Sequence, residues 1–192
     1  MKRLLVRLAL AISRYKMVGT TSERVGVFVG APHTSNWDFV VAVMVMWHNG
    51  LPLRVLVKDD LFKGPLAWIL RAFGGIAIDR NNAVGIVDGL VAEAADAHKP
   101  FVLVVAAEGT RKQGTYWKSG FYRIAEQASL PIILGFVDHD TRTMGVGPTL
   151  RPTGDVRADM DVVRAFYADK GGIKPALRTV PRLREEGERP VA

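Results

Sequence analysis

The 192-residue chain contains no cysteine, and this absence narrows the chemistry open to it. Without a thiol there is no disulfide, no thiolate-bound metal or iron–sulfur cluster, and no cysteine nucleophile. The chain also lacks any apolar, uncharged run of about 18 residues, so we predict no membrane-spanning helix. A G-x-S-x-G nucleophile elbow is missing as well, which argues against a serine hydrolase of that type.

The chain does contain enough apolar residues for a core, together with an excess of positive charge. Hydrophobic residues make up 48% of it and charged residues 23%, a composition typical of a folded domain. Its length suits one domain. Lysine and arginine total 26 against 19 acidic residues, for a net charge of +7. This balance favours anionic partners: phospholipid surfaces, nucleic acids or phosphorylated small molecules.

The first 18 residues carry basic side chains and no acidic ones. The basic residues are Lys2, Arg3, Arg7, Arg14 and Lys16. At helical spacing, the residues that share one arc of about 100° are Leu4, Leu5, Leu8, Ile12 and Tyr15. We therefore predict a basic amphipathic helix over residues 1–18. Such a helix can lie among anionic lipid headgroups or pack on the domain, and both alternatives stay open.

From residue 25 onward, short β-rich runs alternate with segments of helical period. Strands are predicted at 25–29, 54–57, 76–78, 101–106, 131–137 and 143–146. Helices are predicted at 36–49, 61–73, 82–98, 119–128 and 159–169. The alternation indicates a single α/β domain over residues 19–171, with a mostly parallel (mixed) sheet flanked by helices. Residues 172–192 are rich in proline and charge, and we expect a loosely ordered tail there.

His33 follows the first of these strands, and Asp38 lies five residues further on. Pro32 and the S-x-x-D pattern of Ser35 and Asp38 predict that a helix begins near Ser35, so His33 can fold back from the loop towards Asp38. An ionised aspartate beside an imidazole fixes its tautomer and stabilises the imidazolium, as a general base requires. Alternatively, Ser35 and Asp38 form a capping box and His33 has no role.

Glu108-Gly109-Thr110-Arg111 follows the most hydrophobic predicted strand. Glycine lets the backbone approach a ligand closely, and threonine can donate to phosphate oxygens. Arg111 can bind a phosphate through two parallel hydrogen bonds. Glu108 can orient Arg111 or bind a hydroxyl, and Arg80 at another strand end is a second candidate phosphate ligand. The alternative is a polar turn with a local ion pair.

These clusters, followed by Leu130-Pro131-Ile132-Ile133, occur in order over residues 25–140. Together they resemble the glycerolipid acyltransferase family, in which the His-x4-Asp motif is the first element. This is the PlsC-like superfamily, which acylates glycerol phosphate and 1-acylglycerol-3-phosphate. The resemblance implies that His33, oriented by Asp38, removes the proton from an acceptor hydroxyl that attacks an acyl thioester. It also implies that the acceptor, chiefly its phosphate, is held by Arg80, Glu108, Gly109, Thr110 and Arg111.

The chain departs from the family pattern at four positions near these motifs. Pro32 stands where asparagine is common, Ala107 where proline is, Lys112 where serine is, and Leu134 where a second proline is. The His33 and Asp38 positions match the pattern, whereas several changes lie near the expected acceptor pocket. Acyl transfer is therefore better supported than any particular acceptor.

The expected partners follow from this resemblance. They are acyl-CoA or acyl carrier protein as co-substrate, a phosphorylated glycerol or lysolipid acceptor, and an anionic membrane surface, with no cofactor and no metal. No convincing export signal is present, so we expect a cytoplasmic protein associated peripherally with the inner face of the cell membrane. No nucleic-acid-binding signature accompanies the basic charge, and we expect no nucleic-acid partner.

Two other functions remain open at this point. One is a catalytically silent acyl- or lipid-binding protein of the same fold. The other is a metal-dependent hydrolase, whose oxygen and nitrogen ligands would come from His33, Asp38, Asp138, His139 and Asp140. No H-E-x-x-H pair supports the second of these.

Overall fold

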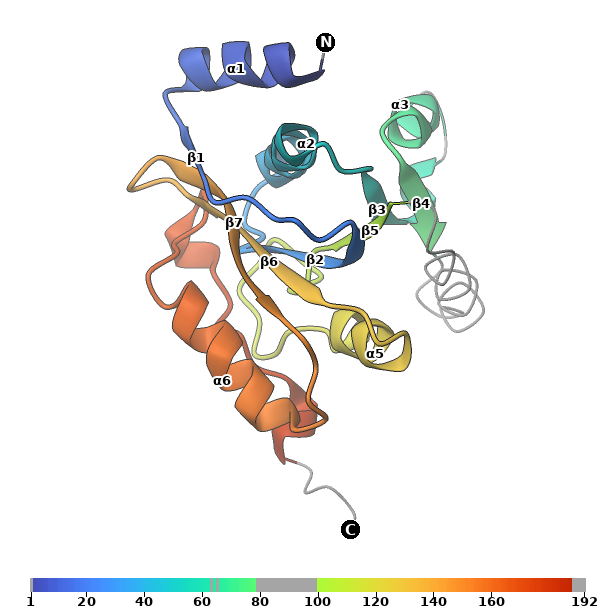
Figure 1. The fold of residues 1–192 in the computed structure, drawn as a ribbon, viewed down its shortest axis with the longest axis vertical. Helices are drawn as coiled ribbons and strands as arrows, with labels where there is room; N and C mark the ends of the chain where they lie inside the picture. Colours follow the sequence, from blue (N-terminus) through green and yellow to red (C-terminus); the bar gives the residue numbers. More distant parts are fainter. Residues whose placement is uncertain (1, 63, 65, 79–99, 188–192) are drawn as a thin grey trace.

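A seven-stranded sheet forms the centre of the molecule in a computed structural model that describes residues 2–62, 64, 66–78 and 100–187 (Figure 1). Its strands are β1 Lys16–Val18, β2 Val25–Ala31, β3 Arg54–Lys58, β4 Gly75–Ile78, β5 Phe101–Val105, β6 Ile132–Asp138 and β7 Thr143–Leu150. They are ordered β1-β7-β6-β2-β5-β3-β4. The strands from β6 to β4 run parallel, whereas β7 is antiparallel to β6. The predicted α/β class with a mostly parallel, mixed sheet is confirmed.

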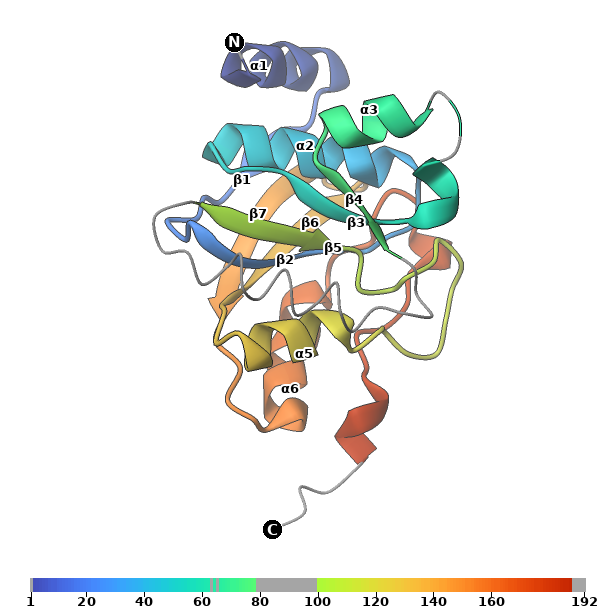
Figure 2. The same cartoon turned by 90° about the vertical axis from the view of Figure 1, so that its right-hand side faces the viewer.

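Helices cover both faces of this sheet (Figure 2). On one side lie α1 Lys2–Ser13, α2 Trp37–Asn49 and α3 Leu66–Ala72, and on the other lie α5 Gly120–Gln127 and α6 Val156–Tyr167. The helix predicted over 61–73 is divided into a 3-10 turn, Asp59–Phe62, and α3, because Gly64 takes a left-handed φ of 79° that ends a helix. The helix predicted over 82–98 lies outside the described residues.

The central strands are buried on both faces, and alternate residues pack against the two helical layers. Val27 and Val29 of β2 lie in the core beneath α5 and α6, whereas Phe28 packs with Val45 and Met46 of α2. Strands covered on both faces read as continuous apolar runs rather than alternating ones. This explains why β5 and β6 stand out in the sequence as unbroken hydrophobic stretches.

The N-terminal helix is shorter than the helix expected over residues 1–18. It ends at Ser13, where Arg14 takes a left-handed φ of 60°, and Lys16–Val18 form the edge strand β1, parallel to β7. Val6 is fully buried and packs in a small cluster with Met44 of α2. Helical periodicity predicts the apolar arc of the helix but not the residue at which the helix ends. The strand β1 was not predicted because three residues are too few to show an alternating pattern.

The C-terminal residues up to 187 pack on the domain, in contrast to the expected loose tail over 172–192. Thr179 and Leu183 are buried, and Arg164 of α6 donates a hydrogen bond of 2.6 Å to Glu186. The proline and charge content predicts a loose tail. Prolines also lower the conformational entropy of the unfolded chain, however, so an extended segment that contains them loses less entropy when it packs. Across the described residues, none of the helices is long and apolar enough to cross a bilayer.

Candidate active site

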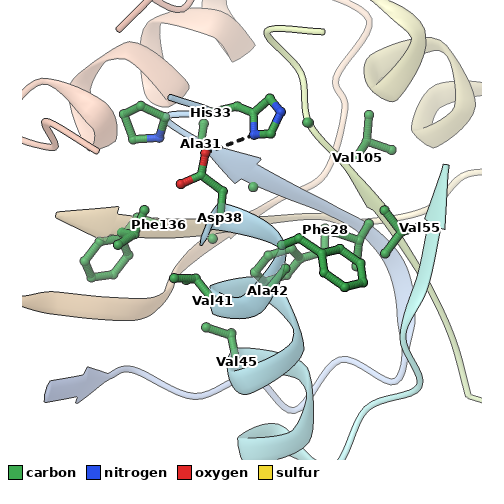
Figure 3. A pocket seen from close by; sticks show the side chains of 17 residues that line it. Phe28, Ala31, His33, Asp38, Val41, Ala42, Val45, Val55, Val105 and Phe136 are labelled. Atoms are coloured by element: carbon green, nitrogen blue, oxygen red, sulfur yellow. Dashed lines mark ion pairs between the residues drawn. The ribbon is translucent and has the colours of Figure 1, made fainter. Parts of the chain in front are cut away.

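The loop between β2 and α2 brings His33 and Asp38 together. The His33 Nδ1 atom lies 3.0 Å from the Asp38 Oδ2 atom (Figure 3). The same oxygen accepts hydrogen bonds from the backbone N–H groups of Thr34, at 2.7 Å, and Ser35, at 2.8 Å. One carboxylate oxygen therefore fixes both the course of the loop and the orientation of the imidazole.

Of the two alternatives that the sequence offered, the structure forms the His–Asp pair. The Ser35 hydroxyl accepts a hydrogen bond of 3.3 Å from the Trp37 backbone N–H, while Asp38 reaches back to the Ser35 N–H. The N-cap residue of α2 is Asn36, however, and its side chain makes no capping hydrogen bond, so the predicted capping box with Ser35 at the N-cap is not formed. The contacts of Ser35 and Asp38 instead hold the loop that precedes α2, and they place Asp38 beside His33.

The second oxygen of Asp38, Oδ1, is buried and has no hydrogen-bond partner among the residues that the structure describes. A carboxylate with so little solvation is stabilised strongly by a positive charge nearby, because screening by water is reduced. Protonation of His33 would supply that charge 3.0 Å from the other oxygen. The pair is therefore suited to a reaction in which His33 gains a proton.

The contacts of His33 also indicate which ring nitrogen could accept a proton. An ionised carboxylate only accepts hydrogen bonds, so the Nδ1 atom facing Asp38 carries the hydrogen in the neutral ring. The lone pair is then on Nε2, on the opposite side of the ring from Asp38 (Figure 3). The His33 side chain is partly exposed, and it also lines the neighbouring cavity.

Glu108 meets the His33 loop from the end of β5. Its side chain is 2% exposed; Oε1 accepts a hydrogen bond of 2.6 Å from the His33 backbone N–H, and Oε2 accepts one of 3.2 Å from Thr179. Burial raises the pKa of Glu108, and the two backbone hydrogen bonds oppose that rise. The resemblance implied that Glu108 holds the acceptor. In the structure both of its oxygens are instead engaged by backbone donors.

The rest of the Glu108 loop turns outward. Gly109 has a left-handed φ of 66°, and a Cβ atom there would lie 2.9 Å from the Lys118 side chain. Thr110 and Arg111 follow in exposed positions, and neither is among the 17 residues that line the neighbouring cavity. The structure thus brings the His33 and Glu108 clusters together, with Arg111 at the surface, while Arg80 lies outside the described residues.

An apolar cavity of about 90 Å³ extends from His33 and Asp38 between α2 and the sheet (Figure 3). Two glycines shape it, and the sequence analysis did not single out either one. A Cβ atom on Gly30 would meet nothing within 4 Å, whereas at Gly135 that position is filled by the Phe28 ring, 1.9 Å away. The cavity therefore exists over Gly30 because no side chain fills it there, and Val41 and Val45 of α2 form its other wall.

The residues considered as metal ligands make other contacts. Asp138 accepts hydrogen bonds from the Thr141 and Gly171 backbone N–H groups, and the Tyr15 hydroxyl lies 2.8 Å from His139 Nδ1. Within the described ranges, no three histidine, aspartate or glutamate side chains are grouped closely enough to hold a metal ion.

The structure thus has an α/β fold in which a paired histidine and aspartate line an apolar cavity. The model of the acyltransferase family matches residues 15–133, more than half of the chain, and the chain belongs to that family. The family that the sequence motifs resemble is thus confirmed. No curated protein matches the sequence.

The fold is shared with a solved glycerolipid enzyme. The crystal structure of the 1-acyl-sn-glycerophosphate (LPA) acyltransferase PlsC from Thermotoga maritima superposes with a TM-score of 0.60 at 15% sequence identity. The match covers 88% of this chain and 77% of that one. At this identity the likeness establishes a common PlsC-like fold.

Replacing Asp38 with asparagine tests the role of the shared oxygen. We expect Asp38→Asn to lower the rate of acyl transfer by about 10²-fold or more, because an amide cannot stabilise the imidazolium and can present a donor to Nδ1. The matched change, Ser35→Ala, removes the hydroxyl that accepts a hydrogen bond from the Trp37 backbone N–H but leaves the His–Asp pair. The loss of this hydrogen bond should cost about 1 kcal/mol in the free energy of unfolding and change the rate little. Equal rates for the two variants would contradict this role for Asp38.

Proposed function

We propose that the protein is a glycerolipid O-acyltransferase. It moves a fatty acyl group from an acyl-CoA or acyl carrier protein thioester to a hydroxyl of a glycerol-phosphate or lysophospholipid-type acceptor. The observation that carries this proposal is the position of His33, which is held by Asp38 at one end of an apolar cavity. Membership of the acyltransferase family supplies the reaction class.

In this mechanism His33 is the general base. Its Nε2 atom takes the proton from the acceptor hydroxyl as that oxygen attacks the thioester carbonyl carbon, and Asp38 stabilises the imidazolium. When the tetrahedral intermediate collapses, the C–O bond remains, the C–S bond breaks, and the leaving thiolate takes up the proton from His33. No acyl-enzyme is required, which fits a site without cysteine. Holding hydroxyl and thioester together supplies much of the rate gain.

The acceptor would lie on the side of the Gly109 turn. Thr110 and Arg111 are exposed just beyond Glu108, whose carboxylate contacts the His33 backbone, so a phosphate bound there is close to the base. Arg111 offers a bidentate contact that suits a phosphate. Arg80, although outside the described residues, stays a predicted second phosphate ligand.

The main test compares His33→Ala and Arg111→Ala in an assay of free CoA release. With a long-chain acyl-CoA and a phosphorylated glycerol or lysolipid acceptor, we expect His33→Ala to lower kcat by about 10²–10⁴-fold. Arg111→Ala should raise the acceptor KM about tenfold or more while kcat changes little, because it removes a binding contact. The adjacent Lys112→Ala serves as a charge-matched control with a smaller effect. If His33→Ala turned over as fast as the wild type, His33 would not be the base. Binding of acyl-CoA without CoA release by the wild type would support the silent lipid-binding alternative instead.

The cavity is the proposed site for the acyl chain. Its walls are almost entirely apolar, and burying each methylene there stabilises the complex by about 0.8 kcal/mol. Gly30→Val would fill the open space over Gly30 without entering a strained backbone region. We expect a rise of at least about tenfold in KM for long-chain acyl-CoA and a much smaller change for short chains. Gly120→Val, at an equally open glycine on α5, is the control. Identical long-chain kinetics in Gly30→Val would place the chain elsewhere.

We further propose that one side of the protein docks on an anionic membrane. Val6 packs inward, and this orientation leaves the apolar arc of α1 exposed by between 54 and 83%. On the neighbouring helices α2 and α3, Trp37 is 67% exposed and Trp68 76%. These helices cover the same face of the sheet (Figures 1 and 2). We call this set the exposed helical face, and its residues are Leu4, Leu5, Leu8, Ile12, Trp37 and Trp68.

Charge complementarity identifies the occupant of this face as an anionic lipid surface. Five lysines and arginines, and no acidic residue, lie among residues 1–18. Basic side chains close to such a surface contribute about 1 kcal/mol each, and tryptophan is favoured where an apolar body meets a wet boundary. The alternatives for α1, packing on the domain and contacting lipid, are compatible because they use different sides of the helix.

Vesicle binding tests this docking surface. The double variant Leu8→Glu/Ile12→Glu places two negative charges on the exposed helical face while leaving the buried Val6 in place. We expect at least about tenfold weaker co-sedimentation with phosphatidylglycerol-containing vesicles, from lost apolar contact and charge repulsion. Val162→Glu changes an exposed valine on α6, across the sheet, and should have no effect. Unchanged binding by the double variant would rule this surface out.

A further inference from the structure

A C-terminal segment lies against the His33 loop although it is beyond the residues that match the acyltransferase family. We call residues 171–179 the C-terminal strap. The Thr34 hydroxyl accepts hydrogen bonds from the backbone N–H groups of Ile173, at 3.1 Å, and Lys174, at 3.0 Å. The family match ends at residue 133, so this contact is made by a part of the chain to which the family pattern assigns nothing.

Glu108 makes the second connection between the strap and the loop. Its Oε1 atom holds the His33 backbone N–H and its Oε2 atom holds the Thr179 backbone N–H. A carboxylate that is 2% exposed is costly to bury unless its oxygens are well bonded, and these two contacts supply that bonding. Both oxygens of Glu108 are therefore directed at backbone donors, one of them that of His33, rather than at a substrate.

Thr34 links the strap to the catalytic pair from the other side. The residue is 1% exposed; its hydroxyl contacts the strap while its backbone N–H donates to Asp38 Oδ2. Gly172 of the strap takes a left-handed φ of 73°, and a Cβ atom there would lie 3.0 Å from both Pro32 and Thr34. The strap is thus packed against the residues immediately before and after His33.

We propose that Glu108 and Thr34 are positioning residues that tie the C-terminal strap to the backbone on both sides of His33. The proposal rests on His33 as the general base of the proposed function. Glu108 holds the His33 backbone, and the strap holds the neighbouring residue Thr34. The loop therefore has a single conformation, and the direction of the imidazole is fixed. A displacement of about 1 Å at a reacting group can cost about 10²-fold in rate, so such clamping matters for the chemical step.

The test separates kcat from KM in three variants. Glu108→Gln keeps the side-chain size but can accept only one of the two backbone bonds, and Thr34→Val keeps the shape but loses the hydroxyl. Neither residue lines the cavity, so we expect kcat to fall at least about tenfold while KM for acyl-CoA and acceptor stays the same. Glu185→Gln is the control: Glu185 bonds Arg123 on α5, away from His33, and kcat should not change.

A conservative substitution at Thr34 separates a loss of kcat from a loss of folding stability. Thr34→Ser keeps the accepting hydroxyl and should retain wild-type kcat, whereas Thr34→Val should not, at comparable melting temperatures. Unchanged kcat in both Glu108→Gln and Thr34→Val would overturn the proposal. So would a raised acceptor KM with normal kcat in Glu108→Gln, because Glu108 would then contact the acceptor directly. Failure of the proposed function has a different signature, namely equal activity of wild type and His33→Ala.

Discussion

Three nitrogen atoms meet the Oδ2 atom of Asp38: the backbone nitrogens of Thr34 and Ser35 and the Nδ1 atom of His33, all within 3.0 Å. The first two bonds fix where α2 begins and how the chain leaves β2. The third bond orients the imidazole. The course of the chain into the helix and the orientation of the His33 imidazole therefore depend on the same interaction, and a change at Asp38 disturbs both together.

The sheet determines what surrounds that interaction. β2 and β5 are adjacent and parallel, with Val29 opposite Val105, so the loops that follow them meet at the same edge. That register brings Glu108 to the His33 backbone. On the α2 side of β2, Gly30 leaves open the space that forms the cavity. The two proposed binding sites follow from this arrangement. The acyl chain would bind in the apolar cavity on one side of His33, and the acceptor would bind at the basic, exposed turn on the other side.

The sequence predicted the features of the fold and the site that depend on local residue patterns. The parallel strands, α2 and the proximity of His33 to Asp38 all follow from short stretches in which apolar period, turn residues and capping chemistry agree. The predicted capping box is not formed, because α2 begins at Trp37 with Asn36 as its N-cap, and Asp38 contacts the preceding loop and His33 through one oxygen. The short strand β1 gave no pattern because three residues are too few.

The partners of Glu108 and the C-terminal strap could not be predicted in this way. Glu108 contacts His33 and Thr179, which lie 75 and 71 residues away in the chain, and Thr34 contacts residues 139 and 140 positions away. These bonds use backbone N–H groups, which every residue except proline carries, so no side-chain pattern marks them. The composition of the last residues indicated a loose tail, although several of those residues are buried against the site.

The most direct test of the central claim is to measure which ring nitrogen of His33 carries the proton. The chain has four histidines, and ¹⁵N-edited imidazole spectra compared with His33→Gln would assign the His33 signals. In the neutral ring we expect a protonated Nδ1, hydrogen-bonded to Asp38, and a bare Nε2 facing the substrate side. A neutral ring protonated on Nε2 would contradict the claim, because the only lone pair would then point at a carboxylate and not at an acceptor hydroxyl.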